Sequence, residues 1–235
     1  MKTPSARFAL NDKTIILNFH GVGPLPQHPI DPGESECWLD ESHFTAILDL
    51  VSDDPRVGIT FDDGNASDHT IVLPALTTRH LTAAFFICAG RIGKPGFLDQ
   101  AQIAEITGAG MEIGNHGTNH RSWRMLPAAE LICELQEGRK ALGLLTGNSI
   151  NTAACPFGAY DRRVLKALSE AGYETVYTSD GGPCRDRWLV ARNTIKRTTT
   201  MHEIDRMIRG SADPSWKLRT SLRMMVKSLR PGRRA

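Results

Sequence analysis

The chain has 235 residues, 40% of them hydrophobic and 23% charged, with 21 glycines and 13 prolines. This composition is typical of a globular protein and excludes a disordered or fibrous chain, and the length suits one large domain with a sizeable core. The net charge of +2 is unevenly distributed: residues 214–235 hold seven Lys or Arg and no acid, which leaves 21 basic and 26 acidic residues in the remainder.

Short apolar runs alternate with segments of helical periodicity along most of the chain. In chain order, the first half predicts a strand at 14–19, a helix at 41–52, a strand at 57–61, a helix at 67–79, a strand at 82–88, a helix at 99–107 and a strand at 111–114. The second half predicts a helix at 127–145, a strand at 152–155, a helix at 162–171, strands at 174–178 and 188–195, and a helix at 202–209. This alternation predicts a parallel sheet with helical crossovers, either open or closed into a barrel.

Three polar clusters each follow the end of a predicted strand. They are Asp62-Asp63-Gly64, the HGTNH segment from His116 to His120, and Pro156-Phe157-Gly158. In parallel α/β folds the carboxyl ends of the strands form the face where ligands bind, so we expect the three clusters to converge.

The residue types in the first two clusters suit a metal site. The spacing of His116 and His120 can place both imidazoles on one side of a helical turn, and two histidines with one carboxylate form an open catalytic set for zinc-like ions. Two adjacent acids such as Asp62 and Asp63 repel each other unless positive charge lies nearby. The alternatives are a surface or capping histidine pair, and an Asp-Gly turn in which Asp63 caps the next helix.

These motifs resemble those of the polysaccharide deacetylase family, the carbohydrate esterases of the chitin and peptidoglycan deacetylase type. TFDDG is present at residues 60–64, HxxxH at 116–120, and the Pro-aromatic-Gly turn at 156–158 is followed by Tyr160-Asp161. The resemblance spans roughly residues 20 to 201. It implies an α/β fold of the distorted (β/α) barrel type, here with about seven strands. The sequence after the barrel adds a basic C-terminal helix.

The resemblance also implies site residues and a reaction. Asp63, His116 and His120 would bind a divalent ion, zinc in the first place, with cobalt, nickel or manganese as alternatives. Asp62 would be the general base, and the backbone N–H of Phe157 would help the metal to stabilise the oxyanion. Such a metal can bring the pKa of water towards ~7, within reach of an Asp base. The implied function is a hydrolase that removes an N-acyl group, in the main case N-acetyl, from an amino sugar in a polysaccharide or glycoconjugate.

The sequence departs from the family pattern at several positions. Ala154 stands where the third motif usually has the Arg that braces the base aspartate, and Gly117 stands where Ser or Thr is frequent. The Asp-Trp pairing of the fourth motif is missing, with only Asp180 nearby, and no Leu-x-His follows near 193–197 to supply the general acid. These departures resemble a branch of the family often linked to exopolysaccharide or glycoconjugate assembly.

Other residues are therefore candidates for the missing roles. His20 ends the first predicted strand and is the candidate acid, with a histidine bonded to local backbone as the alternative. Arg192 on the last predicted strand could replace the missing positive charge. Together with Arg192, we expect the substrate-binding residues to be Pro156, Tyr160 and Asp180.

The C-terminal segment predicts a separate amphipathic helix. We divide the chain into a catalytic domain at 1–212 and a basic tail at 213–235, in which Lys and Arg surround an apolar face formed by Leu218, Leu222, Met225 and Leu229. One interpretation is a final helix packed on the barrel. The other is peripheral contact with an anionic membrane, at about 1 kcal/mol per basic residue. Nucleic acid is not an expected partner, because the rest of the chain is net negative.

Localisation and two further functions complete the expectations. Residues 1–13 lack the apolar run of a signal peptide, and the five cysteines form no CxxC pair, so we predict a cytoplasmic protein, free or peripheral at the inner face of the membrane. The alternative functions are a deformylase or an amidase or imidase on a small C–N substrate, and an inactive sugar-binding pseudoenzyme. The sequence does not indicate the oligomeric state.

Overall fold

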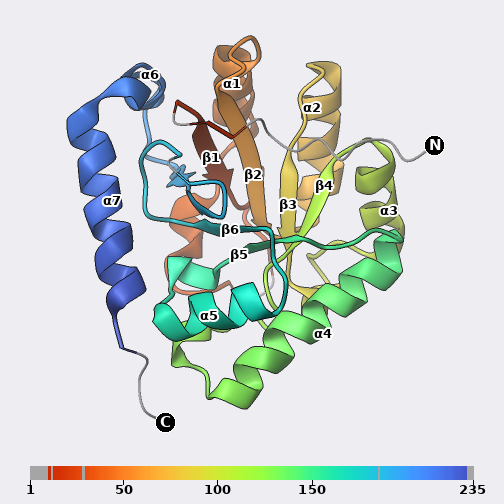
Figure 1. The fold of residues 1–235 in the computed structure, drawn as a ribbon. Coiled ribbons are helices and arrows are strands. Elements are labelled where there is room, and N and C mark those ends of the chain that lie inside the picture. Colours follow the sequence, from red (N-terminus) through yellow and green to blue (C-terminus); the bar gives the residue numbers. More distant parts are fainter. Residues whose placement is uncertain (1–9, 12, 28–29, 185, 232–235) are drawn as a thin grey trace.

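Parallel strands joined by helical crossovers form the centre of the molecule (Figure 1). The computed structural model describes residues 10–11, 13–27, 30–184 and 186–231. Within these residues eight strands lie in the order β7-β6-β5-β4-β3-β2-β1-β8. Their bounds are β1 (Ile15–Phe19), β2 (Val57–Asp63), β3 (Ala84–Ile87), β4 (Glu112–Asn115), β5 (Thr152–Ala154), β6 (Thr175–Thr178), β7 (Leu189–Ala191) and β8 (Asn193–Thr194).

One extended segment joins the two edges of this sheet. Its first part, β7, pairs with β6, and its second part, β8, pairs with β1, so the sheet curls into a nearly closed barrel. Arg192 is the residue between the two strands. The predicted distorted (β/α) barrel is confirmed, and the strand count exceeds the predicted seven because the expected strand at 188–195 is divided at Arg192.

Helices cover the outside of the barrel (Figure 1). They are α1 (Glu41–Val51), α2 (Leu73–Thr78), α3 (Gln100–Gly108), α4 (Ala128–Thr146), α5 (Arg162–Glu170), α6 (Met201–Arg209) and α7 (Pro214–Leu229). The Asp40 carboxylate accepts a hydrogen bond from the His43 N–H and caps α1, as expected. The expected helix at 67–79 instead begins with a π-helical turn at Asp68–Val72, because Pro74 has no N–H to donate to residue 70.

The strand registers decide which side chains enter the barrel. Neighbours in register point to the same side, and successive residues alternate. One layer of the interior is apolar and includes Ile16, Phe86, Ala154, Tyr177 and Val190. On the outer sides of β1, β2 and β3 the rings of Phe19, Phe61 and Phe85 stack in a row, and Phe44 of α1 packs edge-on against Phe19 and Phe61.

The same registers place a polar layer inside the barrel. Asn18 pairs in register with Thr60, and Asp62 pairs with Phe86. Asn18, Thr60 and Asp62 therefore point inwards, and Arg192 reaches them from the segment that closes the barrel. All four side chains are buried.

Helix α7 packs on the side of the barrel next to α5 (Figure 1). It begins at Pro214, close to the expected start of the tail, and contacts the barrel through Thr220, Met224 and Lys227. The predicted apolar face is present but lies on the opposite, exposed side of the helix. No helix in the described residues has both the length and the apolar character needed to cross a membrane.

Candidate metal centre

Asp62 and Asp63 end strand β2 and point in different directions. Asp62 follows the strand alternation into the barrel, whereas Asp63 adopts a left-handed backbone conformation with a φ of 80°. That conformation is costly for a residue other than glycine, and such strain is concentrated at functional sites. The Asp63 side chain is buried, and neither of its oxygens has a hydrogen-bond partner among the described residues.

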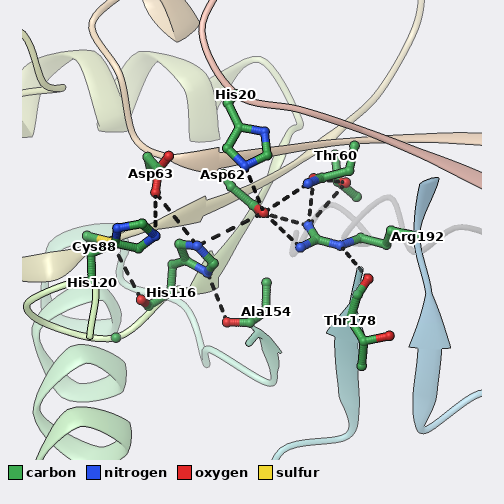
Figure 2. A network of polar contacts seen from close by, with 12 residues as sticks. His20, Thr60, Asp62, Asp63, Cys88, His116, His120, Ala154, Thr178 and Arg192 are labelled. Carbon is green, nitrogen blue, oxygen red and sulfur yellow. Dashed lines mark hydrogen bonds and ion pairs between the residues drawn. The ribbon is translucent and has the colours of Figure 1, made fainter. Parts of the chain in front are cut away.

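Two histidines approach the Asp63 carboxylate (Figure 2). His120 Nε2 lies 3.1 Å from Asp63 Oδ1, and His116 Nε2 lies 3.7 Å from the same oxygen. One ligand atom from each of the three residues lies within 4.8 Å of the others. Arg91 Nη1 is also close, at 3.5 Å from Asp63 Oδ1. The three predicted ligands therefore lie close together, although Asp63 ends β2 and the two histidines follow β4.

The other ring nitrogen of each histidine is held in place. His116 Nδ1 donates a hydrogen bond to the Ala154 carbonyl at 2.9 Å, and His120 Nδ1 donates to Asp31 Oδ2 at 2.6 Å. With the protons on Nδ1, both Nε2 lone pairs face Asp63, which is the tautomer that a metal ligand needs. Burial also lowers the pKa of His116 to about 4, so this ring is neutral at physiological pH.

These features fit a divalent cation. A buried carboxylate without hydrogen-bond donors is costly unless a positive charge balances it. Two imidazole nitrogens and one carboxylate oxygen are the donors that zinc and similar ions prefer, and a three-residue set leaves positions open for water and substrate. Asp63, His116 and His120 could therefore hold such an ion.

The expected helical turn at 116–120 is absent, and a tight loop takes its place. Gly117 and His120 have φ angles of 84° and 49°, which a helix cannot contain. The buried Glu134 of α4 accepts hydrogen bonds from the N–H groups of Thr118 and Asn119 at 2.6 and 3.1 Å. A Cβ atom at Gly117 would lie 2.7 Å from Glu134 Oε2. Together with the φ of 84°, this contact disfavours a Ser or Thr side chain at position 117.

Asp62 forms a bidentate ion pair with Arg192 inside the barrel (Figure 2). Nη1 and Nη2 of Arg192 lie 2.7 and 2.8 Å from Oδ1 and Oδ2 of Asp62, and Asn18 Nδ2 donates to Oδ2 at 3.0 Å. Burial alone would raise the pKa of Asp62, but the Arg192 guanidinium lowers it well below the usual range. The positive charge missing at Ala154 is thus supplied by Arg192.

His20 approaches the same carboxylate from the end of β1. Its Nε2 lies 4.0 Å from Asp62 Oδ2, and its side chain is 19% exposed. His116 Nε2 lies at the same distance from Oδ2 but also faces Asp63. His20 is therefore the histidine beside Asp62 that is not part of the candidate metal set.

The third motif forms one wall of the site. Phe157 has a φ of 58°, is 56% exposed, and its ring centre lies 4.5 Å from that of His120. Pro156 is buried in the turn before it. The Phe157 ring therefore offers an exposed apolar surface beside the histidines.

Tyr160 and Asp180 are engaged away from the two histidines. The Tyr160 hydroxyl donates to Asp180 Oδ2 at 2.7 Å, and Lys227 of α7 lies 2.6 Å from Asp180 Oδ1. Both residues are buried, as is Arg192. Substrate binding by Tyr160, Asp180 and Arg192, and by Pro156, stays a prediction, since the contacts of these residues are with the protein itself.

Asp31 and Arg91 belong to the site and were not predicted from the sequence. Arg91 Nη2 donates to Asp31 Oδ2 at 2.8 Å, and Asp31 in turn accepts from His120. Burial opposes ionisation of Asp31, but His120 and Arg91 lower its pKa overall. Asp31 lies in a loop 89 residues from His120, and no local pattern marks it.

Comparisons with known proteins agree with the fold and with the family that the sequence resembles. The chain is 30% identical to an uncharacterized protein of Streptomyces coelicolor over 54% of this chain and 49% of that protein. It is 23% identical to the peptidoglycan-N-acetylglucosamine deacetylase PgdA of Listeria monocytogenes over 67% of this chain and 34% of PgdA. The chain thus spans half or less of the length of these relatives.

A solved structure shares the fold at low identity. The Streptococcus pyogenes deacetylase PplD, solved in complex with acetate, superposes with a TM-score of 0.72 at 18% identity, over 83% of this chain and 97% of PplD. The family model described as polysaccharide deacetylase matches residues 50–176, which is more than half of the chain and includes Asp62, Asp63, His116 and His120. The chain belongs to the polysaccharide deacetylase family.

Proposed function

We propose that the protein is a metal-dependent hydrolase that removes an N-acetyl group from an amino sugar in a polysaccharide or glycoconjugate. The observation that carries this proposal is the convergence of Asp63, His116 and His120 beside an ionised Asp62. Membership of the polysaccharide deacetylase family supports an N-deacetylation reaction. The amino-sugar substrate class is inferred from the similarity to the named relatives.

Asp63, His116 and His120 would hold the metal. A bound divalent ion acidifies a water molecule and polarises the acyl carbonyl. Asp62 stays ionised because Arg192 pairs with it, so its carboxylate is available to accept a proton. Asp62 Oδ2 is the oxygen that faces His20 and His116, and therefore faces the site.

His20 can complete the proton transfer. In the hydrolysis, a water oxygen bonds to the acyl carbon, the C–N bond breaks, and the departing nitrogen must gain a proton. Asp62 takes one proton from the water, and His20, 4.0 Å from Asp62 Oδ2, is placed to donate one to the nitrogen. The products are acetate and a free amine.

The Arg192–Asp62 pair bears on the pseudoenzyme alternative. That alternative rested on the lack of an Arg at Ala154 and of a late histidine. Arg192 pairs with the base aspartate, and His20 lies beside it. Arg192 can therefore take the role of the missing arginine, and His20 that of the missing histidine. The rival hydrolases of small amides or formyl groups would use the same residues, so substrate assays must separate them.

The test is release of acetate from N-acetylglucosamine oligomers, compared with formate release from N-formyl amino sugars. The wild type should release acetate after loading with zinc or cobalt and lose activity after chelation. Asp62→Asn should be inactive, whereas Asp53→Asn, an exposed control near the start of β2, should be unaffected. Preferential formate release would move the function to a deformylase, and no turnover of any amide by the metal-loaded protein would contradict the proposal.

A further inference from the structure

Helix α7 carries an apolar stripe that nothing covers in the described structure. Of the eleven exposed large hydrophobic side chains in the described residues, five lie on this one helix, between 47% and 68% exposed. They are Leu218, Leu222, Met225, Val226 and Leu229. At 100° per residue these positions fall on one side of the helix, so they form a continuous stripe, which we call the α7 stripe.

Hydrogen bonds to the barrel fix the direction in which this stripe faces. Thr220 Oγ1 donates to the Gly181 carbonyl at 2.9 Å, and Lys227 Nζ donates to the Gly158 carbonyl at 3.2 Å. Arg223 donates to the carbonyl of Asp180, and Lys227 also pairs with the Asp180 carboxylate. Rotating the helix to bury the stripe would break all of these contacts, so the stripe must face outwards.

The charges beside the stripe favour one kind of partner. Arg219, Arg223 and Arg230 lie along one border of the stripe, and the segment 214–235 contains seven basic residues and no acid. If two copies paired through α7, these arginines would approach one another with no acid on either helix to balance them. An anionic surface with an apolar interior beneath it suits both the charges and the stripe.

We propose that α7 docks the protein on an anionic lipid bilayer. The helix lies in the plane of the interface, the α7 stripe enters the boundary between headgroups and acyl chains, and Arg219 and Arg230 contact anionic headgroups. This inference does not depend on the proposed catalytic function. Its failure would leave the metal site untouched.

The contacts of α7 also connect this surface with the catalytic side of the barrel. Gly158, which accepts from Lys227, follows Phe157, and the Phe157 ring packs on His120. The C-terminal end of the helix is therefore next to the loop that borders the candidate metal centre. Docking through the stripe would therefore place α7 between that loop and the membrane surface.

The test is co-sedimentation of the full chain with vesicles of phosphatidylcholine alone and with about one third phosphatidylglycerol. We expect binding to the anionic vesicles that weakens as salt is raised. Leu222→Glu with Met225→Glu should abolish it. The matched control, Ile132→Glu with Leu144→Glu, adds the same charge on exposed positions of α4 and should bind like the wild type. Arg219→Gln with Arg230→Gln should weaken binding by about 30-fold.

Three results would overturn the proposal. The wild type could fail to bind anionic vesicles. The two glutamate pairs could also weaken binding equally, which would show that binding depends on the overall charge of the protein and not on the α7 stripe. Light scattering could also show a wild-type dimer that Leu222→Glu with Met225→Glu converts to a monomer, which would make a second copy the occupant of the stripe. Circular dichroism melting of each variant separates these results from unfolding.

Discussion

The guanidinium of Arg192, in the segment where the barrel closes, donates hydrogen bonds to both carboxylate oxygens of Asp62 at 2.7 and 2.8 Å. The two residues lie 130 positions apart in the sequence. Arg192 also lies over the rings of Phe86 and Tyr177, at 5.2 and 5.8 Å, so its charge is enclosed by protein. One residue therefore closes the barrel and keeps the candidate base ionised.

Replacing Arg192 by Met should impair both stability and the acidity of Asp62. Loss of one partner of a buried ion pair costs about 3–5 kcal/mol, because the other charge stays buried. The double variant Arg192→Met with Asp62→Asn should recover much of that stability in urea unfolding. In any surviving activity, the acid limb of the pH profile should move to higher pH. An unchanged acid limb would show that Arg192 does not control the pKa of Asp62.

His20→Gln should slow turnover about 100-fold or more without changing metal content, since a positioned acid contributes roughly 10²–10⁴. Comparison of kcat with metal stoichiometry separates the proton-donor role from a metal-binding one. His202→Gln changes an exposed histidine and is the matched control. Equal rates in wild type and His20→Gln would exclude His20 as the acid.

Asp31→Asn should weaken metal binding about 10- to 100-fold, the usual effect of losing the partner that orients a histidine ligand. Asp31 contacts His120 at 2.6 Å but lies outside the expected ligand set. A competition titration with a chelating dye measures the affinity directly. The metal affinity of the control Asp53→Asn should equal that of the wild type. A wild-type metal affinity in Asp31→Asn would show that Asp31 does not orient His120 for metal binding.

His116 should make the metal-free protein less stable in mild acid. Its pKa is about 4 when folded and near 6.5 when unfolded, so the unfolded chain binds more protons between these values. Stability is therefore lost as pH falls through this window, by about 2 kcal/mol between pH 7 and pH 5. Urea unfolding with chelator present should show that loss in wild type and a smaller loss in His116→Asn. If the free energy of unfolding fell equally with pH in wild type and His116→Asn, His116 would not be the group responsible.

The parts of the site that were predicted from the sequence are those in which adjacent residues act together. Asp62 and Asp63 follow a recognisable strand, and His116 and His120 follow another, so the rule that ligands gather at the carboxyl ends of parallel strands placed them correctly. Arg192 was a candidate for the missing charge, and the structure places it in an ion pair with Asp62.

Other features depend on contacts between distant segments and leave no local pattern. The loop at 116–120 is not helical because Glu134 of α4 binds its backbone N–H groups, and i, i+4 spacing cannot reveal this. Asp31 meets His120 only after the barrel forms. The outward direction of the α7 stripe is set by carbonyl groups of the loops after β5 and β6, which a helical wheel does not contain.

The central claim is that Asp63, His116 and His120 hold one divalent metal ion. Its most direct test is the metal content of the protein purified without chelator, compared with His116→Ala plus His120→Ala. We predict about one zinc, cobalt, nickel or manganese ion per chain in the wild type and none in the double variant, with both proteins folded by circular dichroism. A folded wild type that carries no metal and does not bind added zinc would contradict the claim.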